Sequence, residues 1–117
     1  MNVYVRVSRN QFRLKNTGTG AETLVAPPFT TTRLLVGQFN VAETALKEAL
    51  RQVVGKGLFT PSPQVVMHPT EMTEGGLSEV EERVLRELAL GAGASKVAIW
   101  VGAELSDAQV KEQLDGK

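Results

Sequence analysis

The first part of the chain alternates between apolar and polar residues. Residues 3–8 alternate valine with tyrosine, arginine and serine, and Phe12 and Leu14 continue this period of two. Such alternation is typical of β-strands with one buried face. A turn-rich stretch at 16–20 precedes a third short candidate strand at 22–25, and the prolines at 27 and 28 cannot donate to a central ladder. We therefore predict a three-stranded β-meander over residues 1–26.

From residue 34 onward the apolar residues recur with a helical period. Three capping residues are each followed three positions later by Glu or Gln, as in a capping box: Asn40 with Glu43, Ser78 with Glu81, and Ser106 with Gln109. We expect a helix behind each of them. Gly55 should end the first helix, Gly91 or Gly93 should end the second, and the third should span residues 107–114.

Two short apolar runs, 65–67 and 97–101, are rich in β-branched residues and fit buried parallel strands. Trp100 lies in the second run, so we expect it in the core. The predicted order is βββαβαβα. We therefore predict one α/β domain over residues 1–117, in which a meander at 1–26 and strand-helix units at 34–117 form a mixed sheet with helices packed on it.

Composition excludes several classes of protein. Thirteen basic and thirteen acidic residues cancel, so no overall field draws the chain to nucleic acid or to an anionic membrane. The absence of cysteine excludes disulfides and thiolate chemistry and fits a reducing compartment. No stretch approaches the ~18 apolar residues of a spanning helix, and the N-terminus lacks the pattern of a signal peptide. We expect a cytoplasmic protein without a membrane segment.

Charge is nevertheless unevenly distributed along the chain. Residues 1–40 contain five basic residues and one acid, whereas residues 68–93 contain six acids and two arginines. Strand alternation places Arg6, Arg13 and Lys15 on one face of the predicted hairpin, where they could bind an acidic protein partner or a second copy of the chain. Together with Tyr4 they could also hold single-stranded nucleic acid, but one aromatic residue on a neutral domain is less than a dedicated binder shows.

Residues 34–101 resemble a known family. The most specific part is Glu79-Val80-Glu81 followed by Gly91-Ala92-Gly93-Ala94, which is similar to the first subdomain of the bacterial actin homologues that determine rod shape. The resemblance implies a ribonuclease H-like fold, shared with the actin-like ATPases. It also places Glu81 at the family glutamate that helps position the water attacking the nucleotide. The capping pattern with Ser78 explains the same residue without any ligand.

The nucleotide-binding parts of that family are replaced in this chain. The family's first phosphate loop reads Asp-Leu-Gly-Thr, whereas residues 7–11 read Val-Ser-Arg-Asn-Gln, and a family Glu-Glu-Pro-Ala stretch reads Gly-Ala-Glu-Leu at 102–105. A phosphate cradle and a metal-binding carboxylate are therefore missing, and two-metal nuclease chemistry fails for the same reason. We expect no ATP binding, no cofactor and no ATPase activity.

His68 is the single histidine, which excludes a site with two histidine ligands within one chain. It follows the 65–67 run, at the end of a strand where open α/β sheets bind ligands. His68, Glu71 and Glu81 are therefore candidate ligand contacts, and Glu71 could pair with Glu74 as acid and base. The simpler interpretations are a loop histidine bonded to backbone near Pro69 and two solvated acids.

Three functional hypotheses follow, in order of preference. The first is a non-enzymatic protein-interaction or assembly module that resembles a reduced actin-like subdomain. The alternative is a small enzyme or ligand-binding domain that uses His68 and the 70–76 loop. The third is a weak binder of single-stranded nucleic acid.

Overall fold

The computed structural model describes residues 1–31, 34–55, 60–73 and 75–116. Their order is βββαβαβα, as predicted. The elements are β1 (Asn2–Ser8), β2 (Gln11–Asn16), β3 (Glu22–Val25), α1 (Phe39–Val54), β4 (Gln64–Pro69), α2 (Glu79–Gly91), β5 (Lys96–Ile99) and α3 (Asp107–Asp115). The chain is therefore a mixed α/β fold.

The five strands form one mixed sheet in the order β3-β2-β1-β4-β5. The meander strands pair antiparallel, whereas β4 is parallel to β1, and β5 is parallel to β4. A two-residue turn, Arg9 and Asn10, joins β1 to β2, and Asn10 has a φ of 49°. Asparagine tolerates this left-handed conformation better than most residues, which suits a tight hairpin.

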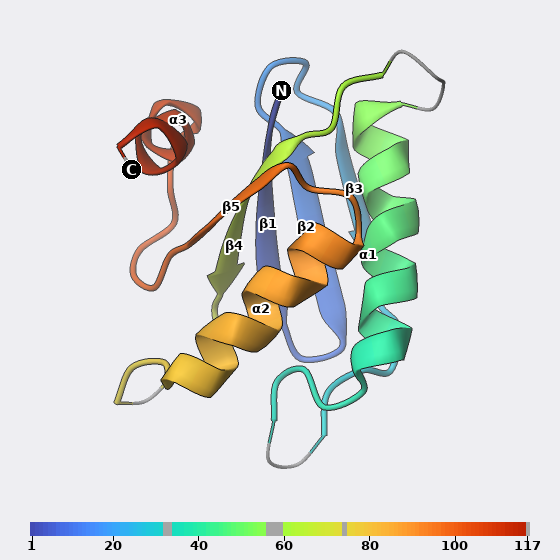
Figure 1. Cartoon of the computed structure of the whole chain (residues 1–117), viewed down its shortest axis with the longest axis vertical. Coiled ribbons are helices and arrows are strands. Elements are labelled where there is room, and N and C mark those ends of the chain that lie inside the picture. Colours follow the sequence, from blue (N-terminus) through green and yellow to red (C-terminus); the bar gives the residue numbers. More distant parts are fainter. Residues whose placement is uncertain (32–33, 56–59, 74, 117) are drawn as a thin grey trace.

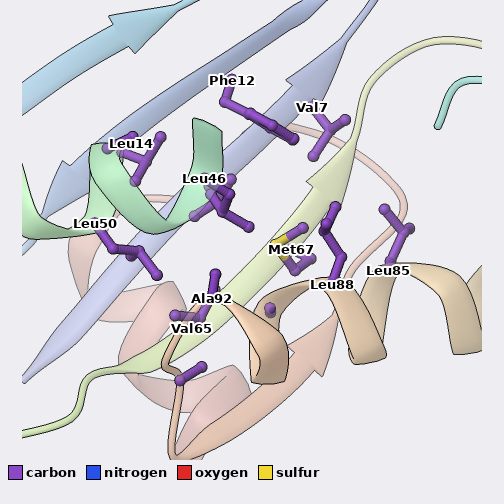
Figure 2. Packing of buried hydrophobic residues seen from close by; sticks show 14 of the residues in the cluster. Val7, Phe12, Leu14, Leu46, Leu50, Val65, Met67, Leu85, Leu88 and Ala92 are labelled. Atoms are coloured by element: carbon purple, nitrogen blue, oxygen red, sulfur yellow. The ribbon is translucent and has the colours of Figure 1, made fainter. Parts of the chain in front are cut away.

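Helices α1 and α2 cover one face of the sheet (Figure 1). The odd-numbered residues of β1 and the even-numbered residues of β2 point into this face, as the alternation predicted. Figure 2 shows these side chains meeting residues from both helices. The buried members from the sheet and the two helices include Val7, Phe12, Leu14, Leu46, Leu50, Val65, Met67, Leu85 and Leu88.

Helix α3 packs on the opposite face, against β1, β4 and β5. A smaller cluster is buried there, made of Tyr4, Val66, Leu105, Val110 and Leu114. Within the described ranges, no helix packs on this side of β2 and β3. One part of the sheet therefore presents a bare face.

Two of the three predicted capping boxes are confirmed. Ser78 and Ser106 each cap a helix, and both reciprocal bonds of the box are present. The third was wrong, because α1 begins at Phe39, its N-cap is Gln38, and no side chain caps it. Phe39 packs partly buried against the core, so tertiary contact starts the helix before Asn40. Gly55 follows the end of α1 with a φ of 109°.

The last strand is shorter than predicted. β5 ends at Ile99, the last residue of β5 that pairs with β4, and the chain turns away at Gly102, whose φ is 147°. The expected core position of Trp100 holds only in part: its side chain packs partly buried against the smaller cluster under α3, and its indole Nε1 donates to the Ala103 carbonyl at 2.8 Å. In the part of the chain that the structure describes, no helix has the length and apolar character needed to cross a membrane.

Candidate functional site

The structure separates the predicted site residues into three places. Arg6, Arg13 and Lys15 share the sheet face on which α3 packs, at the part that α3 leaves uncovered. His68 is buried beside them under the chain that follows β5. Glu71 and Glu81 lie at the other side, next to α2.

The basic residues come together on what we call the open sheet surface, defined as Arg6, Arg13 and Lys15 with their neighbours. Arg6 lies directly opposite Arg13 in the antiparallel register, and Tyr4 lies opposite Lys15. The surface surrounds a polar hollow of about 180 Å³. Acidic residues from elsewhere also line it: Glu22, Glu104 and Asp107.

Two of the three basic side chains already have partners within the chain. Arg6 Nη1 lies 2.7 Å from Glu104 Oε1, and Lys15 Nζ lies 3.1 Å from Asp107 Oδ1. Arg13 is exposed and makes no ion pair among the described residues. Charge counting along the sequence missed this compensation, because Glu104 and Asp107 lie some ninety residues away and only the packing of α3 brings them here.

His68 lies near the end of strand β4 and is 3% exposed, so the predicted strand-end position is confirmed and the alternative of a loop histidine is wrong. Its Nδ1 lies 2.6 Å from the Tyr4 hydroxyl, which accepts a hydrogen bond from the Leu105 amide at 3.1 Å. Its Nε2 lies 2.9 Å from the Gly102 carbonyl. One assignment satisfies every group: Leu105 donates to Tyr4, Tyr4 donates to Nδ1, and Nε2–H donates to Gly102.

In this assignment the imidazole is neutral. Burial lowers the pKa of His68, while the hydrogen bond to the Gly102 carbonyl acts in the opposite direction. Burial also raises the pKa of Tyr4. Both ring nitrogens of His68 are engaged within the chain, so the network holds the chain after β5 against the sheet and offers a ligand no ring nitrogen.

Glu71 and Glu81 line one apolar pocket of about 80 Å³, together with Leu35, Met72 and Leu77 among others. Glu71 Oε2 accepts from the Arg9 amide at 2.7 Å, and Glu81 Oε1 accepts from the Ser78 amide at 2.9 Å. One oxygen of each carboxylate thus accepts from a backbone amide, and Glu71 Oε1 lies 3.7 Å from Arg9 Nε. The proposed pairing of Glu71 with Glu74 lies outside the described residues.

Among the residues that the structure describes, the site predicted from His68 and the 70–76 loop is not brought together. The His68 ring faces the α3 side, whereas Glu71 and Met72 line the pocket beside α2. The sequence placed them together because they are neighbours along the chain, but alternation at the end of β4 puts His68 on one side of the sheet and Pro69 on the pocket side, where Glu71 and Met72 follow. Among the described residues, no group of three or more acidic, histidine or cysteine side chains could hold a metal ion.

The turn between β1 and β2 is the stretch that the expected actin-like resemblance would align with a phosphate loop. Its two backbone amides already have acceptors, because Arg9 donates to Glu71 and Asn10 donates to the Thr30 hydroxyl at 2.8 Å. Both amides of this turn are therefore already paired with side-chain oxygens of the chain itself.

Comparison with known proteins finds a relative that aligns with the chain along almost its whole length. No protein-family model matches the chain. The chain is 33% identical over 124 aligned positions to the uncharacterized protein YjaA of Escherichia coli (strain K12), and the alignment covers 98% of each chain. Similarity of this extent spans the meander, the strand-helix units and α3 alike. The chain therefore belongs to the same family as this Escherichia coli protein.

Proposed function

We propose that the chain is a non-catalytic protein-interaction module that binds an acidic segment of a partner protein through its open sheet surface. The observation that carries this proposal is the placement of Arg6 directly opposite Arg13, next to the part of this sheet face, over β2 and β3, that no helix covers among the described residues. The module is cytoplasmic in this proposal and needs no cofactor.

Like charges directly opposite each other in an antiparallel pair are destabilising. Glu104 compensates Arg6, but Arg13 keeps an exposed guanidinium in the middle of the surface. A guanidinium matches a carboxylate in two parallel hydrogen bonds, which an ammonium cannot do. An acidic partner would therefore relieve the repulsion that the register creates.

We further propose a ribonuclease H-like topology, similar to a reduced actin-like subdomain. The order βββαβαβα, with an antiparallel meander leading into two parallel strands, supports this assignment. The occupied amides of the β1–β2 turn and the capping role of Glu81 support a module without nucleotide hydrolysis. The second and third hypotheses have less support, since His68 is internally bonded and the surface has few aromatic side chains.

The proposal is tested with a short fluorescein-labelled oligoglutamate peptide, titrated at low and high salt. Exposed ion pairs contribute ~0.2–1 kcal/mol, so Arg13→Gln should weaken binding about twofold to fivefold, and salt should weaken it further. Arg83→Gln on α2 is the matched control, because it removes the same exposed charge away from the surface. Equal binding by the wild type and both variants would reject the proposal.

Two further titrations separate the other hypotheses. Millimolar ATP with magnesium should leave the amide chemical shifts of residues 7–12 unchanged. Specific shifts there would instead support nucleotide binding. Oligothymidylate should bind no more tightly than oligoglutamate. Tighter binding of the DNA that is lost in Arg13→Gln would favour the nucleic-acid hypothesis.

A further inference from the structure

Residues 102–107, which we call the connector, run from the end of β5 to the start of α3. Most residues of the connector make a hydrogen bond or are buried against the rest of the chain. The Gly102 carbonyl accepts from His68, the Ala103 carbonyl accepts from Trp100, and the Leu105 amide donates to Tyr4. Leu105 is buried and Ser106 caps α3. The backbone of the connector is therefore held firmly against the sheet.

The two acidic side chains of the connector are attached differently. Glu104 and Asp107 remain 68% and 51% exposed while they pair with Arg6 and Lys15. Exposed pairs of this kind are weak and exchange readily. The buried hydrogen bonds nevertheless keep both carboxylates next to the cations, which raises their effective concentration there.

We propose that the connector is autoinhibitory: Glu104 and Asp107 act as an internal substitute for the acidic segment that the open sheet surface binds. This inference rests on the proposed function and adds its regulation. Arg13 is the cation left for first contact, and a partner gains Arg6 and Lys15 only by displacing the two connector carboxylates.

The surface also specifies the shape of the partner segment. Arg13 and Lys15 are two positions apart on one strand and share a face, and Arg6 lies across from Arg13. Side chains two residues apart on a strand are ~6.7 Å from each other. An extended segment with carboxylates at alternate positions has the same spacing, so it can match Arg13 and Lys15 together.

The test compares wild type with Glu104→Gln/Asp107→Asn, using a fluorescein-labelled peptide in which glutamate alternates with serine. Release of two exposed pairs should tighten binding about threefold to tenfold. Glu79→Gln/Glu82→Gln is the matched control, because it removes two exposed charges from the first turn of α2, away from the surface. This control should bind less than twofold more tightly than wild type.

Asp107 lies in the first turn of α3, where a negative charge stabilises the helix. The single variant Glu104→Gln leaves that turn intact and should tighten binding about twofold to fivefold. An unchanged Leu105 amide signal in each variant shows that the connector is still seated.

The outcomes separate this inference from the proposed function. If the connector variants bind no more tightly than the α2 control while Arg13→Gln still weakens binding, autoinhibition is refuted and the interaction surface stands. If Arg13→Gln changes nothing in either background, the proposed function fails and the inference fails with it. Tighter binding of oligothymidylate than of the peptide in the connector variants would also overturn the choice of partner.

Discussion

The face of the sheet under α1 and α2 and the face under α3 differ in how completely they are covered. The first carries a continuous apolar cluster that receives side chains from the sheet and both helices. The second carries five buried apolar or aromatic residues, one buried histidine network and a bare charged part over β2. The same strands supply both faces, so the difference comes from what packs on them.

The two faces contribute differently to stability. Burying a large aliphatic side chain contributes about 1.5–3 kcal/mol, whereas a net hydrogen bond contributes about 1 kcal/mol. The α1/α2 face therefore dominates stability. The α3 face buries fewer side chains. Charged residues can lie beside its small cluster because the uncovered part of the sheet over β2 remains in contact with water.

The largest expected effect is on the α1/α2 face. Leu46→Ala removes a fully buried side chain from α1 and should lower the free energy of unfolding by about 2–5 kcal/mol. Leu114→Ala removes an equally buried side chain from α3 and should instead increase hydrogen exchange mainly within α3. Urea unfolding and amide exchange of both variants measure the contrast. Equal global destabilisation would show that the two faces unfold as one unit.

An intermediate effect is expected in the histidine network. Tyr4→Phe keeps the ring but leaves the Leu105 amide and His68 Nδ1 without a partner, which should cost about 1–3 kcal/mol. Trp100→Phe is the control, because it removes a hydrogen bond from a partly exposed side chain and should cost less. A double-mutant cycle with His68→Leu should show coupling. Additive effects of Tyr4→Phe and His68→Leu would contradict the network.

A smaller effect is expected from pH. Burial lowers the pKa of His68 below its value of ~6.5 in the unfolded chain, so the unfolded state binds more protons as pH falls. Stability is therefore full above about pH 6.5 and should fall on acidification toward the folded pKa. Unfolding midpoints between about pH 7.5 and about pH 5.5 measure it, a window in which ordinary carboxylates stay charged.

The control for this prediction is His68→Gln, because the chain contains one histidine. The variant should lose most of the pH dependence in that window. An unchanged slope would assign the dependence to other groups and would leave the neutral imidazole without support.

Much of the fold could be predicted because its signals are local. The period-two pattern located β1 and β2, and the spacing of Ser78 with Glu81 and of Ser106 with Gln109 located the starts of α2 and α3. The start of α1 and the end of β5 were misplaced because contacts between elements, rather than local pattern, set them.

The candidate site could be predicted only in part. Alternation correctly grouped Arg6, Arg13 and Lys15, because residues on paired strands share a face. It did not reveal Glu104 and Asp107, which reach that face through the turn after β5. The partners of His68 were missed for the same reason, since Tyr4 and Gly102 are distant in sequence and meet it through the parallel pairing of β1 with β4 and the path of the connector.

The type and order of the elements, the apolar side of β1 and β2, and the two serine capping boxes could be read from the sequence alone. These depend on backbone sterics, side-chain period and contacts within a few residues. The face that α3 covers, the pairing of two of the three hairpin cations and the buried hydrogen bonds of His68 became evident only from the packing of the whole chain. Those features depend on how segments that are distant in sequence pack against each other. Neither the balanced charge of the chain nor the presence of one histidine predicts that packing.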